Sequence, residues 1–119
     1  MRVLLVGGYR LLVKALQQGL EDEGYTVDAS FHGPEENDRI AAANHDAIVF
    51  DLERPESAVL SRLQRWRRAG LKAPVLVLTA PHAIGDTTLA IDSGADDWLT
   101  KPFEMDEFLG RLRALAQRA

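Results

Sequence analysis

The chain has 119 residues, of which 46% are hydrophobic and 27% are charged, so it is long enough for one domain with a sizeable core. Its 14 basic and 18 acidic residues give a formal net charge of −4, which argues against nucleic-acid binding by the domain as a whole. The chain has no cysteine, which excludes disulfides and thiolate metal sites, and no apolar run long enough for a membrane span, so we expect a cytoplasmic protein.

Short apolar runs alternate along the chain with amphipathic segments. The runs predict strands at residues 3–6, 25–31, 47–50, 75–78 and 97–100. Three of them (VLLV, AIVF and VLVL) are apolar without alternation, as expected of parallel strands that are covered on both faces.

The segments that follow the strands predict helices at residues 10–23, 34–43, 56–69, 84–93 and 104–117. Strand and helix therefore alternate five times, which predicts an α/β fold of (βα)5 type with one doubly wound parallel sheet. Right-handed crossovers place helices on both faces of such a sheet and the carboxyl ends of its strands along one edge.

Apolar residues at helical spacing predict which side of each helix is buried. In the first helix the predicted stripe consists of Leu11, Leu12, Ala15, Leu16, Gly19 and Leu20. In the third helix Trp66 falls on the apolar stripe with Leu63, so we interpret it as a core residue. The basic residues around it, which we interpret as a solvated face, are Arg62, Arg65, Arg67 and Arg68.

Three polar residues of complementary chemistry fall at the predicted carboxyl edge of the sheet. Asp51 follows the third strand, Thr79 ends the fourth and Lys101 ends the fifth. Each alone is readily explained as a loop acid, a turn hydroxyl or a solvated lysine. Together they form a plausible phosphoryl-accepting site, with the carboxylate as nucleophile and the other two groups holding the oxygens of the transferred group.

The motifs LLV, EDEGYTVD, AIVFDL, APVLVLTA and GADDWLTKPF span nearly the whole chain. On these motifs the chain resembles the receiver domain of two-component response regulators, most closely the winged-helix (OmpR/PhoB) type. The resemblance implies a flavodoxin-like fold and a signalling module rather than an enzyme. It also implies that Asp51 is the phosphoacceptor, Thr79 the switch hydroxyl and Lys101 the phosphate-binding lysine.

The chain departs from the family pattern where a pair of acidic residues holds magnesium. In this chain those positions are Gly7 and Gly8. A magnesium ion would therefore have only Asp51 as a ligand, helped at most by the backbone carbonyl of Glu53. Magnesium is usually held through one or two carboxylates in a near-octahedral set of oxygens, so we expect weak or absent binding and no cofactor. Two like charges about 4 Å apart repel by about 4 kcal/mol at an effective dielectric of about 20. The loss of two of the three clustered acids therefore removes the repulsion between them and Asp51. We therefore predict a direct contact between Asp51 and Lys101.

Trp98 stands where the family has a tyrosine or phenylalanine that turns inward on phosphorylation. Indole is bulkier than phenol and needs a partner for its N–H when buried. We expect Trp98 to be held outward or locked, which would compromise the switch formed with Thr79.

The resemblance also implies a homodimer that pairs through the fourth helix, the fifth strand and the fifth helix. The residues carried over to this face are Ile91, Asp92, Asp97, Glu107, Leu109, Arg111 and Arg113. Asp97 with Arg111 and Asp92 with Arg113 match two expected bridges between subunits, whereas the basic partner of Glu107 is replaced by Thr87.

Three functional hypotheses follow. The first is an atypical receiver domain, residues 1–119, that dimerises and controls transcription with little or no magnesium-dependent phosphorylation. The second is a conventional receiver phosphorylated on Asp51 by a sensor histidine kinase. The third is a small-ligand-binding module, although GGYRLL matches a dinucleotide-binding fingerprint only at its first glycine. The subfamily resemblance implies DNA binding only through a further, C-terminal domain, and no membrane partner.

Overall fold

The protein is an α/β fold built on one parallel sheet, as predicted. The computed structural model describes residues 1–7, 9–30, 44–51, 57–79 and 94–117. Within these residues the sheet has five strands in the order β2-β1-β3-β4-β5. The strands are β1 (Arg2–Gly7), β2 (Thr26–Ser30), β3 (Ala47–Asp51), β4 (Val75–Thr79) and β5 (Asp97–Thr100). Every neighbouring pair is parallel, so the carboxyl ends of the strands share one edge.

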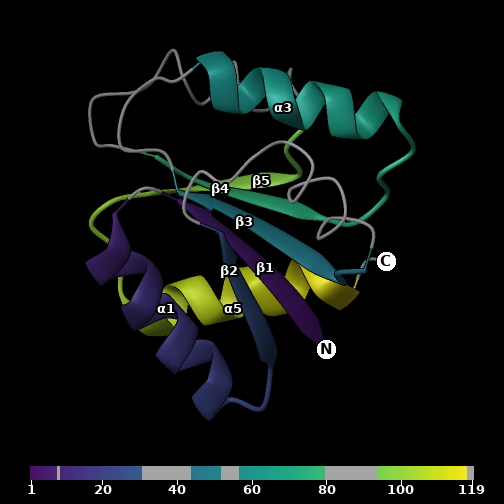
Figure 1. Ribbon diagram of the computed structural model, residues 1–119. Coiled ribbons are helices and arrows are strands. Elements are labelled where there is room, and N and C mark those ends of the chain that lie inside the picture. Colours follow the sequence, from purple (N-terminus) through teal and green to yellow (C-terminus); the bar gives the residue numbers. More distant parts are fainter. Residues whose placement is uncertain (8, 31–43, 52–56, 80–93, 118–119) are drawn as a thin grey trace.

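Helices cover both faces of the sheet (Figure 1). Helices α1 (Arg10–Asp22) and α5 (Met105–Gln117) lie on one face, and α3 (Ser57–Arg68) lies on the other. The predicted helices at residues 34–43 and 84–93 lie outside the described residues. None of the described helices combines the length and the apolar character that a membrane span requires.

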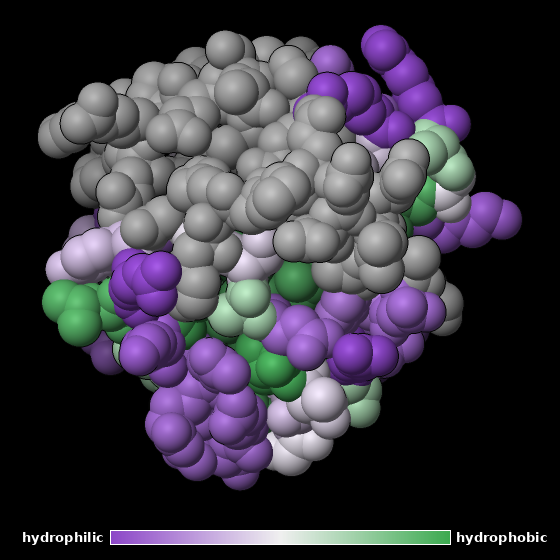
Figure 2. Space-filling view, in the orientation of Figure 1, coloured by the Kyte–Doolittle hydropathy of each residue, from purple (hydrophilic) through white to green (hydrophobic). Residues whose placement is uncertain are grey.

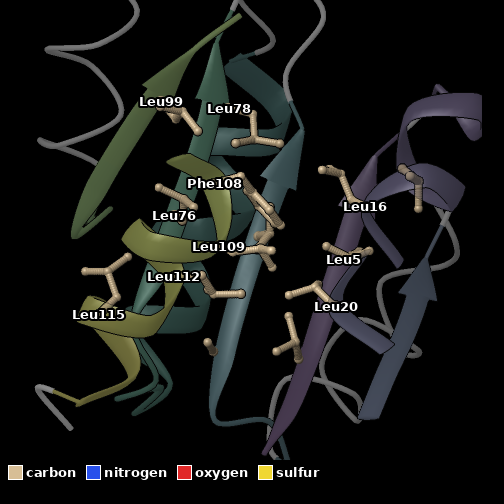
Figure 3. Packing of buried hydrophobic residues seen from close by; sticks show 14 residues of the cluster. Leu5, Leu16, Leu20, Leu76, Leu78, Leu99, Phe108, Leu109, Leu112 and Leu115 are labelled. Atoms are coloured by element: carbon tan, nitrogen blue, oxygen red, sulfur yellow. The ribbon is translucent and has the colours of Figure 1, made fainter. Parts of the chain in front are cut away.

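The sheet separates two apolar clusters, because successive side chains of a strand point to opposite faces. Val3 and Leu5 of β1 belong to the cluster under α1 and α5, whereas Leu4 and Val6 belong to the cluster under α3. Figure 3 shows leucines of β1 and α1 packed together, and leucines of β4 packed against α5. Strands buried on both faces explain the apolar runs without alternation.

The predicted buried stripe of α1 is partly wrong. The buried residues are Val13, Leu16 and Leu20, whereas Leu11 is 71% exposed and Ala15 is also exposed. An α-helix has 3.6 residues per turn, so a stripe through those three residues leaves Leu11 on the opposite side.

On the face seen in Figure 2 the described residues are mostly hydrophilic, with small hydrophobic areas between them.

Trp66 is a core residue, as predicted, but its neighbour Arg67 does not belong to a solvated face. Trp66 is 8% exposed, and its ring centroid lies 5.3 Å from that of Phe50. The half-buried guanidinium of Arg67 donates to the carbonyl of Gly94 at 2.8 and 3.0 Å and pairs with Asp96 at 2.8 Å. It also donates to the carbonyls of two residues after α3, Leu71 at 3.1 Å and Ala73 at 2.8 Å.

This arrangement joins the end of α3 to the amino ends of β4 and β5, because Asp96 also accepts a hydrogen bond from the backbone N–H of Val75 at 2.7 Å. The planar fork of arginine supplies donors in several directions at once, which explains why one side chain satisfies four acceptor groups. Arg67 therefore has a structural role that its exposed neighbour Arg68 lacks.

We expect Arg67→Met to destabilise the protein by about 2–3 kcal/mol, because it leaves half-buried carbonyls and a carboxylate without their charged donor. Arg68→Met is the matched control and is expected to change stability by less than about 0.5 kcal/mol. Urea unfolding followed by circular dichroism measures both. Equal unfolding midpoints for the two variants would contradict a structural role for Arg67.

Candidate functional site

The carboxyl edge of the sheet brings Asp51 and Lys101 together. Asp51 is the last residue of β3, at the centre of the sheet, and its side chain is only 2% exposed. Lys101 directly follows β5, beyond the intervening strand β4, and its ammonium Nζ contacts Oδ1 of Asp51. The expected contact between the two side chains is therefore present.

The backbone positions Lys101 for this contact. Its N–H donates to the carbonyl of Thr79, the last residue of β4, at 2.8 Å. The peptide bond between Lys101 and Pro102 is cis. The lysine side chain thus starts from a fixed point next to β4 and crosses the end of that strand to reach β3.

Thr79 joins the site through its backbone rather than through its side chain. Its side chain is buried, with 1% of the residue exposed, and its hydroxyl has no hydrogen-bond partner among the described residues. A buried hydroxyl without a partner is costly, so this group is available to an oxygen that enters the site. The structure therefore places all three predicted residues at one edge and joins only Asp51 and Lys101 by their side chains.

Gly7, the predicted position of a lost metal ligand, lies directly beside Asp51. It ends β1, it is buried, and it is the register partner of Asp51 on the neighbouring strand β3. The other two positions of this prediction, Gly8 and Glu53, lie outside the described residues.

Trp98 lies on β5 at the edge of the sheet and is 38% exposed, which agrees with an indole held outward. Its backbone N–H donates to Oδ1 of Asp97 at 2.8 Å, and its carbonyl accepts a hydrogen bond from Arg111 at 3.2 Å. Asp97 and Arg111 also pair with each other, at 3.3 Å, within the same chain. This residue pair was expected to form a bridge between subunits.

The rest of the predicted dimer face is divided between surface and core. Glu107 and Arg113 are exposed on α5. Leu109 is 8% exposed and belongs to the core cluster under α5, so little of its side chain is available to a partner. Ile91 and Asp92 lie outside the described residues.

A second polar cluster, at the amino edge of the sheet, was not predicted. Nε2 of His45, whose side chain is 1% exposed, lies 2.7 Å from Oδ2 of Asp28, and Arg2 pairs with the same oxygen at 3.0 Å. The hydrogen bond from His45, helped by the charge of Arg2, holds the pKa of Asp28 below its ordinary value. The sequence gives no signal for this cluster, because only the pairing of β1 with β2 and β3 brings the three residues together.

We expect Lys101→Met to destabilise the protein by about 3 kcal/mol, because it leaves the carboxylate of Asp51 buried without its cation. The double variant Asp51→Asn/Lys101→Met should recover much of this loss, since it removes both charges. Exposed Lys72→Met is the matched control for losing one lysine. Urea unfolding tests the set, and equal midpoints for Lys101→Met and Lys72→Met would show that the ion pair contributes nothing.

The chain is similar in sequence to known regulatory proteins. The chain is 41% identical over 113 residues to the transcriptional regulatory protein DltR of Streptococcus agalactiae, covering 95% of this chain and 50% of DltR. It is 40% identical over 118 residues to the response regulator protein PmrA of Pseudomonas aeruginosa, covering 99% and 53%. The chain therefore spans about half the length of these relatives.

The solved receiver domain of the Francisella response regulator 1452 has a TM-score of 0.83, with 27% identity and coverage of 98% and 97% of the two chains. The predicted flavodoxin-like fold is thereby confirmed. Residues 3–113 match the protein-family model described as the response regulator receiver domain, and the chain belongs to that family.

Proposed function

We propose that this receiver domain controls transcription through dimerisation, with little or no magnesium-dependent phosphorylation of Asp51. The observation that carries the proposal is the buried contact between Asp51 and Lys101, formed beside a glycine. One carboxylate and one ammonium cancel, so the described part of the site is neutral without a divalent ion.

The described residues do not fit magnesium. This ion demands near-octahedral coordination by oxygens and is usually held through one or two carboxylates. Gly7 offers no side chain, and Oδ1 of Asp51 already contacts the ammonium of Lys101. A cation beside Gly7 would find a single described carboxylate, whose charge is already balanced by the ammonium of Lys101.

The relatives suggest how the domain acts in a longer protein. DltR and PmrA are about twice as long as the chain, and DltR is named as a transcriptional regulatory protein. We infer that a C-terminal winged-helix domain binds DNA. If the domain is phosphorylated, we infer that a sensor histidine kinase is the upstream partner. The receiver domain would then set the distance and orientation of two DNA-binding domains by pairing.

A conventional receiver is the second candidate, and the buried hydroxyl of Thr79 favours it. In that case a carboxylate oxygen of Asp51 attacks the phosphorus of a phosphohistidine, a P–O bond forms and the P–N bond breaks. Lys101 and Thr79 would then hold the oxygens of the transferred group. This route requires Lys101 to leave or to share the oxygen that it contacts.

Incubation with a small phosphodonor and millimolar magnesium, followed by intact-mass measurement, distinguishes the two candidates. We expect no phosphoryl adduct and no rise of the melting temperature with magnesium. Asp51→Asn is the blank, and a receiver domain that carries the acidic pair is the positive control. An adduct that disappears in Asp51→Asn would favour the conventional receiver.

The proposed dimer uses the surface formed by β5 and α5. Asp97 and Arg111 pair within one chain at 3.3 Å, and both are partly exposed. Exposed ion pairs contribute only about 0–1 kcal/mol, so exchanging this partner for the same residue of a second copy costs little. Two-fold symmetry doubles each such contact. Because Leu109 is buried, Trp98 is the described large apolar side chain on β5 that remains for a partner to cover.

We expect Arg111→Glu to weaken self-association at low salt by placing like charges opposite each other. Arg68→Glu makes the same change on α3, on the other face of the sheet, and should leave association unchanged. Sedimentation velocity at low and high salt measures both. A dimer that survives Arg111→Glu would exclude this surface as the interface.

A further inference from the structure

The first strand passes Asp51 so closely that position 7 has no room for a side chain. An ideal Cβ built at Gly7 would lie 2.8 Å from Cβ of Asp51 and 3.1 Å from Cγ2 of Val13. It would also lie 3.3 Å from Oδ2 of Asp51. Real Cβ atoms essentially never come within 3.0 Å of such a neighbour, so a side chain here requires something to move.

The atoms that would have to move are held firmly. The position of a Cβ atom is set by the backbone, so no change of rotamer takes the Cβ of Asp51 away. The backbone of Asp51 lies in β3, which is hydrogen-bonded to β1 on one side and to β4 on the other. Val13 is 1% exposed in the core under α1. Relief therefore requires β1 and β3 to separate locally.

The carboxylate of Asp51 is enclosed between two neighbours. Its Oδ1 contacts Lys101, and its Oδ2 lies over Gly7. A side chain at position 7 would push on Asp51 and through it on the ion pair. The glycine is thus coupled to Lys101, although the two residues lie on opposite sides of Asp51.

We propose that Gly7 is a specificity-determining residue of this site, in that it decides whether the site can hold a metal ion. Because Gly7 has no side chain, β1 lies so close to Asp51 that a metal-binding carboxylate at position 7 has no room. This inference rests on the proposed function and gives it a packing basis. The site lacks a ligand at position 7, and it also lacks the space for one. Restoring an acidic residue at this position alone therefore does not restore magnesium binding.

Gly7→Ala tests the packing without adding a ligand. We expect it to lower the urea midpoint clearly, because it adds only the methyl group that has no room. Gly110→Ala is the matched control: Gly110 is exposed in α5, an added Cβ there meets nothing within 4 Å, and alanine favours a helix. The control should keep or raise the midpoint.

A double-mutant cycle with Asp51→Gly identifies the clash. Asp51→Gly removes the Cβ that the new methyl group meets at 2.8 Å, so the loss caused by Gly7→Ala should shrink in that background. If Gly7→Ala alone does not fold, restored folding in the double variant supports the inference. An undiminished loss in the Asp51→Gly background overturns it.

Calorimetric titration of Gly7→Asp with magnesium chloride completes the test. We expect a lowered urea midpoint and no binding at millimolar magnesium. Magnesium binding by Gly7→Asp would overturn the inference, as would a Gly7→Ala protein as stable as Gly110→Ala. Magnesium binding by the unaltered protein would instead refute the proposed function, while the stability comparison at position 7 would still stand.

Discussion

The structure depends on the ion pair between Asp51 and Lys101. A carboxylate at the end of a central strand, with its side chain 2% exposed, is tolerated only if a partner offsets the loss of water. The strand order provides that partner, because β4 alone lies between β3 and β5 at this edge. The close approach of Gly7 on the other side completes the enclosure. Charge balance and packing at the site therefore have the same origin, the strand order β1-β3-β4-β5, which places Gly7 on one side of Asp51 and Lys101 on the other.

Strand β5 is held at both of its ends by a basic side chain. At the amino end, Arg67 of α3 binds the carbonyl of Gly94 and the carboxylate of Asp96, just before the strand. At the carboxyl end, Lys101 binds Thr79 through its backbone and Asp51 through its side chain. A displacement of β5 would have to break both sets of contacts. The strand that carries the proposed dimer surface is thus coupled to the acceptor edge and to the opposite face of the sheet.

The sequence predicted the strands well, because uninterrupted apolar runs reflect burial on both faces of a parallel sheet. It also predicted the meeting of Asp51 and Lys101, since all parallel strands end at one edge. It could not predict the structural role of Arg67, because the segment contains four arginines that the sequence does not distinguish. Only the position of the chain after α3 shows which of them donates to backbone carbonyls there. The stripe of α1 was misplaced because Leu11 and Ala15 are apolar but exposed. The sequence showed that Gly7 lacks a carboxylate, but not that space is lacking, which depends on the distance between two strands.

Trp98 shows how the outer edge of the sheet is protected. Strand β5 is terminal in the order of strands, and an unpaired strand edge is a template for the addition of a foreign strand. Here the carboxylate of Asp97 accepts a hydrogen bond from the backbone N–H of Trp98, and Arg111 donates one to the carbonyl of Trp98. The backbone N–H and carbonyl of Trp98 are therefore both hydrogen-bonded. Charged side chains thus cap the backbone where an aromatic residue would favour β-aggregation. In the proposed dimer, two copies would meet at β5 through their side chains without merging their sheets.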